Sequence, residues 1–316
     1  MALPSGLAAQ IGWAEETTWG TPVTVDTFAP LVSESIGFEK TRLESSGIIS
    51  GRTILDTDQV KAGNRTVSGD IQLEAYEQSI GTVLKHALGT VSTTGSGPYT
   101  HTITPGDLTG LGLTVQVGRP DVGGTVRPYT FSGCKVESVE LAIAAGEIAT
   151  LGVSVVGKDV ATNTALASVS YAAQASRPFT GIEATTSTWG GGALEIKQVS
   201  LSIANNLDAD RRFLGTDTID EPLQAELRTI DGSLEVEFSS LALWEDFASL
   251  TYRDLIVTAT NGVESLSYTV HARLDGVEPQ VGGRGLVTTD IPYVVSGDGS
   301  DADAVTIVYT SDDATI

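Results

Sequence analysis

The sequence is poor in the residues that build most catalytic and metal sites. Its 316 residues include one cysteine, Cys134, and three histidines, His86, His101 and His271. A single cysteine excludes an internal disulfide framework and a multi-thiolate metal site within one chain. The histidine spacing matches no metal-binding motif, and no nucleophile-elbow, P-loop or dinucleotide-binding pattern occurs. We therefore expect a protein that is not an enzyme and that binds no cofactor or metal.

Basic side chains are also scarce. Eighteen lysines and arginines stand against forty acids, which gives a formal charge of −22. Tight binding of nucleic acid requires basic side chains that displace counterions from phosphates. The charge therefore argues against a protein that grips DNA or RNA, although it leaves open that DNA passes nearby.

Long apolar runs are absent as well. The apolar stretches have the length of strands, and none approaches the ~20 residues that a membrane-spanning helix needs. The first twenty residues lack the basic segment and the continuous apolar segment of a secretory signal. These features predict a protein without a membrane partner that is made and folded in the cytosol.

The sequence does contain a repeat. Residues 65–77 read RTVSGDIQLEAYE, and residues 228–240 read RTIDGSLEVEFSS. Across this offset of 163 positions Arg65 and Arg228, Gly69 and Gly232 are identical, and the apolar positions keep their class. Both copies alternate apolar and polar residues, which is typical of a strand with one buried face and one wet face.

The segments that flank each copy also correspond. A short amphipathic pattern follows each repeated strand, at 76–89 and at 239–252, and predicts one helix in each half. Strand patterns come next, with Asn261-Gly262 as a hairpin signal. Tyr129 and Tyr268 correspond at an offset of 139, so the first half carries about 24 extra residues, which we place at 89–106.

These patterns predict a mainly β protein that is a tandem duplication. We expect a β-sandwich or barrel-like domain at residues 1–165 and another at 166–316, with the seam at 161–179. Each domain should carry one short flanking helix and one long loop. The loops, at 45–64 and 208–227, exceed the usual hairpin length, so we expect them to project and to contact a partner.

The order of these segments resembles a known family. The opening IGWAEETTWGTPVTVDTFAPLVSESIGFEKT, then GDIQLEAYEQSIGTVLKHALG and YTFSGCKVESVELAI, resemble the major tail tube protein of long-tailed, siphovirus-like phages and related prokaryotic viruses. The resemblance covers nearly the whole chain, although each motif alone is short.

The resemblance implies a structural protein of the virion tail that assembles in the host cytoplasm. Single-domain relatives close a ring with six subunits, so a two-domain chain would close it with three, and the rings would stack into a hollow tube for genome ejection. The implied partners are other copies of the chain, the tape measure protein, and the tail terminator and distal tail proteins. Viral DNA would pass through the lumen without specific binding.

Candidate residues follow from this interpretation. Acidic walls would repel phosphates over about 10 Å at 0.1 M salt, so the polar face of the repeated strands and their partners is expected to line the lumen. The candidates for the lumen are Asp70, Gln72, Glu74, Glu137, Glu140, Asp231, Glu235 and Glu237. The candidates for contacts between rings are Arg52, Arg211, Arg212 and Asp217.

Other interpretations share the β-rich, acidic character. A tail terminator or a capsid decoration protein is the main alternative, although terminators cap a tube rather than polymerise. A secreted adhesin or carbohydrate-binding module is a second alternative, and the missing signal segment argues against it. An enzyme is a third, since no pattern selects a catalytic pair among the forty acids.

Overall fold

Strands form most of the computed structural model, which describes residues 5–316 except 173–176, 277, 282–283 and 285. The expectation of a mainly β protein is confirmed. Part of the expected seam, residues 173–176, lies outside the described residues. No helix in the described part of the chain is long and apolar enough to cross a membrane.

The first half forms one helix, α1 (Gly81–Leu88), and a series of strands. The helix ends at Gly89, whose φ of 110° favours glycine. The strands are β1 (Gln10–Glu15), β2 (Thr27–Ala29), β3 (Ser33–Glu34), β4 (Gly37–Glu44), β5 (Val60–Glu74), β6 (Gly89–Gly95), β7 (Tyr99–Pro105), β8 (Leu113–Pro120), β9 (Val126–Ala144), β10 (Thr150–Gly157) and β11 (Asp159–Ala161).

The second half is also mainly β. Its helices are α2 (Ala242–Ala248) and the short α3 (Asp301–Ala304). Its strands are β12 (Ala184–Trp189), β13 (Gly192–Ala193), β14 (Ile196–Ala204), β15 (Thr229–Glu237), β16 (Arg253–Thr260), β17 (Ser265–Leu274), β18 (Thr288–Val295) and β19 (Val305–Ser311).

One antiparallel sheet runs through both halves. Its strand order is β4, β5, β10, β9, β14, β15 and β18. The halves meet where β9 pairs with β14, for example Leu141 opposite Leu201. The long strand β9 serves two sheets, because its N-terminal part pairs with β8 and its C-terminal part pairs with β10 and β14.

Three strands in each half pair in a similar order. In the first half β9 pairs with β8, which pairs with β1, while in the second half β17 pairs with β16, which pairs with β12. Phe131 lies opposite Val115 as Val270 lies opposite Leu255. Trp13 and Trp189 occupy matching positions on the next strands.

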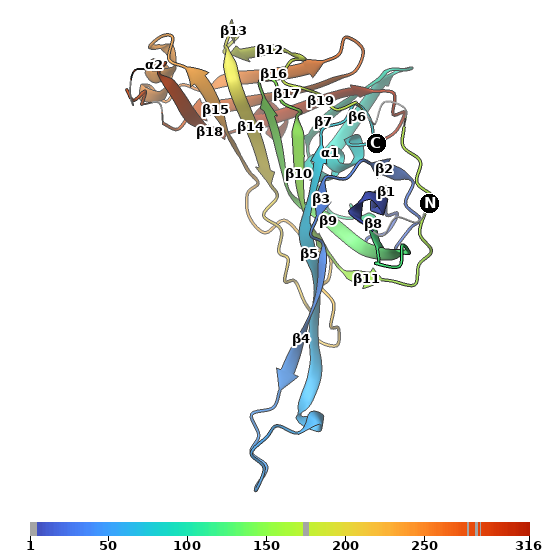
Figure 1. Ribbon diagram of the computed structural model, residues 1–316. Coiled ribbons are helices and arrows are strands. Elements are labelled where there is room, and N and C mark those ends of the chain that lie inside the picture. The colour runs from blue at the N-terminus through green and yellow to red at the C-terminus, as the bar shows by residue number, and fades with distance from the viewer. Residues whose placement is uncertain (1–4, 173–176, 277, 282–283, 285) are drawn as a thin grey trace.

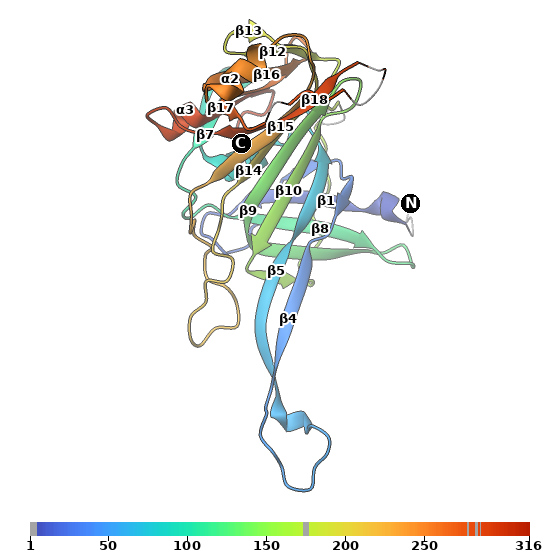
Figure 2. The same ribbon diagram turned by 90° about the vertical axis from the view of Figure 1, so that its left-hand side faces the viewer.

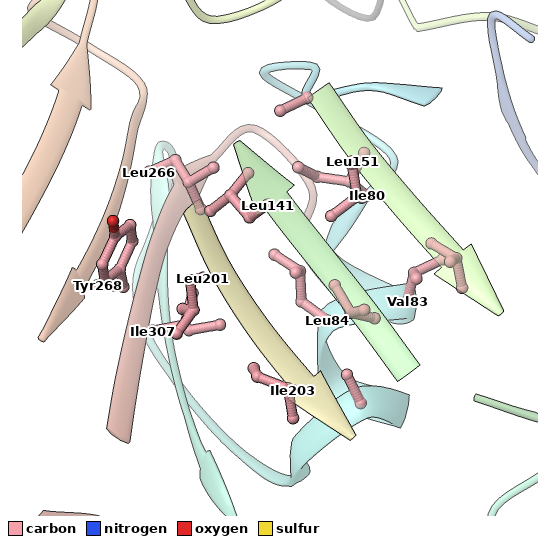
Figure 3. Close-up of a cluster of buried hydrophobic side chains, with 14 of the residues drawn as sticks. Ile80, Val83, Leu84, Leu141, Leu151, Leu201, Ile203, Leu266, Tyr268 and Ile307 are labelled. Carbon is pink, nitrogen blue, oxygen red and sulfur yellow. The ribbon is translucent and has the colours of Figure 1, made fainter. Parts of the chain in front are cut away.

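The apolar core is continuous across the two halves. Figure 3 shows Leu84 of α1 and Leu141 of β9 in one cluster with Leu201, Leu266 and Ile307 of the second half. These side chains are at most 3% exposed, and burial of each leucine or isoleucine contributes about 1.5 to 3 kcal/mol. Cys134 is fully buried in the same core, as its strand pattern predicts, and burial raises the pKa of its thiol.

The extra residues of the first half form a hairpin that joins the halves. Strands β6 and β7 pair with each other, and β7 pairs in turn with β19 of the second half. The same hairpin packs on α1 and so completes the burial of Val83, Leu84 and Ala87.

No hairpin of the described residues packs on helix α2 as β6 and β7 pack on α1. The expectation that the apolar residues of α2 form a buried face is only partly right. Leu243 and Phe247 pack against the core, whereas Trp244 is 43% exposed and Asp246 is the one buried residue in the helix. The sequence pattern is the same in both halves, but the covering hairpin exists in one.

Two segments project from the body in the same direction. The hairpin of β4 and β5 forms a long arm, and the segment 205–228 between β14 and β15 descends beside its base (Figures 1 and 2). The expectation that both segments project is confirmed. The arm is longer than expected because β5 already begins at Val60 and pairs there with Glu44.

Candidate assembly surfaces

The first candidate surface is one face of the sheet that runs through both halves. Residues with their side chains on the opposite face, such as Ile71, Leu141 and Leu201, are buried in the core. Strand alternation therefore places the residues between them on a solvent-facing surface. We call this surface the acidic face.

Polar residues line up across the acidic face from strand to strand. In one row Gln72 lies opposite Gly152, which lies opposite Glu140. The row continues through Ser202 to Asp231 in the second half. Directly opposed residues on a sheet lie about 4.5 to 5.5 Å apart, so the carboxylates of both halves share one surface.

Small side chains separate these acids. On the central strands, the positions between the acids carry glycine, alanine or serine, so this part of the surface is smooth. These residues are Ala142, Gly152, Ser154, Ser200, Ser202 and Ser233. The acids on the face are Asp70, Glu74, Glu140, Asp231, Glu235, Glu237 and Asp290. Two lysines lie beside these acids within the described residues: Lys197 pairs with Glu237 at 2.9 Å, and Lys135, opposite Val156, is buried.

Most of the expected lumen residues lie on this one face. The structure brings together Asp70, Gln72, Glu74, Glu140, Asp231, Glu235 and Glu237, although they come from three strands. Glu137 does not follow the alternation, because a β-bulge places Val136 opposite Val155 and Ser138 opposite Ser154. The bulge leaves Glu137 between these pairs, half-buried at the junction with the second half.

Asp290 is a further member of the face that the sequence reasoning missed. It lies on β18 opposite Glu235 of the repeated strand. The alternation of Thr288, Asp290 and Pro292 with buried Thr289 and Ile291 was the available signal. Only the pairing of β18 with β15 shows that this alternation belongs to the same surface.

The second candidate surface is the free edge of β4 at one end of the sheet. Within the described residues β4 pairs with β5 alone. The N–H of Ser35 donates to the carbonyl of Asp70 at 2.8 Å, so alternation directs the N–H groups of Ile36, Phe38 and Lys40 away from β5. At the other end, β18 pairs with β17 from Tyr293 onward, and the carbonyl of Pro292 accepts from the N–H of Asp275 at 2.8 Å. Among the described residues, Thr288 to Ile291 have no pairing strand on that side.

The third candidate surface comprises the arm and the segment 205–228. The arm exposes Ile48 and Ile54 by 96% and 82%, and the second segment exposes Phe213 and Leu214. Exposed apolar groups of this size on projecting segments indicate a contact with another protein chain.

The four residues expected at contacts between rings have partners inside the chain. Arg52 pairs with Asp56 at 3.3 Å, and Arg212 pairs with Asp210 at 2.5 Å. Arg211 pairs with Asp220 at 3.3 Å.

Asp217, the fourth of these residues, contacts the first half of the chain. It pairs with Arg65 of the first half at 2.8 Å, and the Arg65 guanidinium holds the pKa of the Asp217 carboxyl below its ordinary value. Arg65 also pairs with Asp159 at 3.0 Å. Asp217 therefore fixes the segment 205–228 to the first half.

Comparison with known proteins identifies the family of the chain. No curated protein matches the sequence. The model of one protein family, described as phage tail tube protein, matches residues 6–295, which is nearly the whole chain. The chain therefore belongs to the phage tail tube protein family, whose members are structural components of the viral tail that assemble into a tube.

Proposed function

We propose that three chains close a ring of six equivalent domains, and that these rings stack into the tube through which the viral genome passes into the host. The observation that carries this proposal is a sheet that is continuous through both halves, acidic on its solvent face and open at both ends. The family favours a tube protein over the capsid decoration, terminator and adhesin alternatives. The tube would join the tape measure, terminator and distal tail proteins in a tail assembled in the host cytoplasm.

The matching strand pairing supports the tandem duplication that this ring requires. The repeated strands β5 and β15 correspond at an offset of 163, and each pairs on both sides with corresponding strands. Between β11 and β12 the boundary at residue 165 separates two sets of strands with the same order of pairing. Each half then takes one of six equivalent places in the ring.

The junction between the halves supplies a template for the junction between chains. Inside the chain β14 pairs with residues 138–144 of β9. By the offset of 163, β4 is the counterpart of β14, and its outer edge is free. Val136 lies opposite Val155 in the first half, and Leu274 lies opposite Tyr293 in the second half. Residues 138–144, which follow Val136, therefore correspond to the segment that follows Leu274. We infer that β4 of one chain pairs with this segment of the next.

Side-chain exposure supports the same junction. Leu201 of β14 is 1% exposed, whereas its counterpart Phe38 of β4 is 41% exposed. Ile143 of β9 is 5% exposed, whereas its counterpart Val281 is 80% exposed. Positions that are buried where the halves meet are thus uncovered at the two ends of the chain, and ring closure would bury them.

Ring closure would also turn the acidic face into the wall of a barrel. A closed sheet has no free edge, which removes the risk of uncontrolled pairing. The proposed pairing of β4 with the segment after Leu274 adds Glu278, the counterpart of Glu140, to the wall. A wall of carboxylates repels the phosphates of passing DNA over about 10 Å at 0.1 M salt, so the DNA slides without binding.

Association of the rings should strengthen as salt rises. Each chain carries a formal charge of −22, and the proposed register places Glu39 opposite Glu278, which are like charges. Salt screens this repulsion. Light scattering of the purified protein should therefore report more assembly at high than at low sodium chloride, and the opposite trend would contradict this register.

Positive charge in the bore should make the tube retain DNA. Glu140, Asp231 and Glu235 make no side-chain hydrogen bond or ion pair among the described residues, so their replacement by lysine should cost within about 0.5 kcal/mol each. The three changes move the formal charge from −22 to −16. Counterion release should then make tubes bind a fluorescent single-stranded oligonucleotide, and the binding should weaken as salt rises.

The matched control carries the same charge change on other exposed acids. The replacement of Asp298, Asp303 and Asp312 by lysine should leave co-sedimentation of the oligonucleotide close to that of the wild-type tubes. Equal binding by the two triple variants would show that Glu140, Asp231 and Glu235 do not line the bore.

A further inference from the structure

A buried ion pair fixes the segment 205–228 of the second half to the first half. The Lys135 ammonium lies 2.6 Å from a carboxylate oxygen of Glu221 and donates to the carbonyl of Leu108 at 2.7 Å. The same Glu221 oxygen accepts from the N–H of Gly110 at 2.6 Å. Lys135 is 3% exposed, so this contact between the halves is shielded from solvent.

The counterparts of these two residues have no such contact inside the chain. At the offset of 163, Glu221 corresponds to Asp58 at the base of the arm. The strand registers make Arg273 the counterpart of Lys135, and the residues that follow each of them are aliphatic and then acidic. Arg273 pairs only with nearby Asp275 among the described residues, and Asp58 is exposed without a basic partner there.

A cavity lies where a neighbouring chain would complete this contact. In the first half Arg65 is covered by Asp217 of the second half. Among the described residues its counterpart Arg228 donates to neutral acceptors alone, Asn205 at 2.7 Å and the carbonyl of Gly106 at 3.4 Å. Burial lowers the pKa of Arg228.

This cavity has space and a lining suited to a peptide segment. Its volume is about 350 Å³. Its lining includes Arg228, one acid and several apolar side chains: Asp301, and Leu227, Ile230, Val295 and Ala304. The counterpart of residue 217 is Ile54, an isoleucine that is 82% exposed on the arm. In the first half Asp217 occupies the site beside Arg65, whereas in the second half the corresponding site beside Arg228 is an open cavity.

We propose that the base of the arm of a neighbouring chain, residues 54–58, docks against the second half of this chain. Ile54 enters the cavity beside Arg228, and Asp58 pairs with Arg273. This inference rests on the proposed ring and identifies its partner, since the neighbour whose β4 pairs with the segment after Leu274 also supplies the arm. Within the chain β14 and the segment 205–228 likewise belong to one half.

Charge reversal provides the test. Asp58→Lys and Arg273→Glu should each weaken ring formation by about tenfold or more, because truncation or reversal of one member of an interfacial charge pair leaves the other unpaired. The double variant should recover to near the wild-type association, measured by analytical ultracentrifugation. Asp312→Lys, with the same charge change at another exposed acid, should associate as the wild type does.

The results separate this inference from the ring itself. If wild-type protein forms no rings, the proposed function fails. If it forms rings and both single variants match Asp312→Lys, or the double variant is no better than the singles, the docking site is wrong. If the single variants close rings but no longer stack, the arm docks on a chain of the next ring, which overturns the neighbour proposed here.

Cross-linking gives a second measurement that does not depend on affinity. The native Cys134 is fully buried, so the Asp58→Cys and Arg273→Cys variant contains two accessible thiols. Oxidation of its rings should produce covalently linked trimers on a non-reducing gel. Only monomeric chains after oxidation of assembled rings would contradict the contact.

Discussion

Replacement of residues 48–51 by a Gly-Ser-Gly linker should stop tube growth while rings still form. This change removes the exposed tip of the arm, including Ile48 and Ile49, and retains Ile54, which the proposed contact within the ring uses. It also retains Asp56 and Gln59, whose side chains accept hydrogen bonds from backbone N–H groups and cap the short turn that leads into β5. Burial of one isoleucine contributes about 1.5 to 3 kcal/mol. Loss of two such contacts should raise the critical concentration for stacking by roughly a hundredfold or more.

Electron microscopy and sedimentation would measure this effect. Free rings without tubes are the expected products. Ile182→Asp is a suitable control, because Ile182 is 80% exposed but lies far from the arm in the sequence. Normal tubes from the linker variant would show that the arm does not join the rings. The linker must stop before Val60, since β5 already pairs with β4 at that residue.

A proline at position 40 should block ring closure. The N–H of Lys40 points away from β5, so Lys40→Pro removes a donor from the free edge of β4 and no hydrogen bond of the chain itself. Proline is tolerated on an edge strand whose N–H faces solvent, but it cannot pair with a further strand. Each junction between chains would lose a hydrogen bond worth about 1 kcal/mol and meet a steric clash with the proline ring.

Lys40→Ala is the matched control, because it removes the same side chain and retains the N–H. The alanine variant should form rings at concentrations where the proline variant remains monomeric, as judged by analytical ultracentrifugation. Circular dichroism should show the same strand content for both variants. Ring formation by a folded proline variant would mean that β4 is not the edge that pairs.

The strands and the acidic face could be predicted because alternation is a local property. The pattern of Ile71 and Leu73 against Asp70, Gln72 and Glu74 indicates both the strand and its wet side. Helix α1 was predictable for a similar reason, since its apolar spacing and Gly89 lie within a single short segment.

Features that depend on distant contacts could not be predicted in this way. The bulge at Glu137 breaks the alternation where β9 meets the second half, so that residue could not be placed from its neighbours in sequence. The exposed face of α2 has its cause in a hairpin that covers only α1. The pairing of Asp217 with Arg65 joins residues 152 positions apart, and no local pattern indicates it.

The most direct test of the proposed ring is a cryo-electron microscopy reconstruction of the assembled protein at a resolution that separates strands. The account predicts three chains in each ring, with Glu140 and Asp231 on the wall of the bore and β4 of each chain paired with the segment after Leu274 of the next. Six chains in each ring, or a bore lined by other residues with the acidic face turned outward, would contradict it.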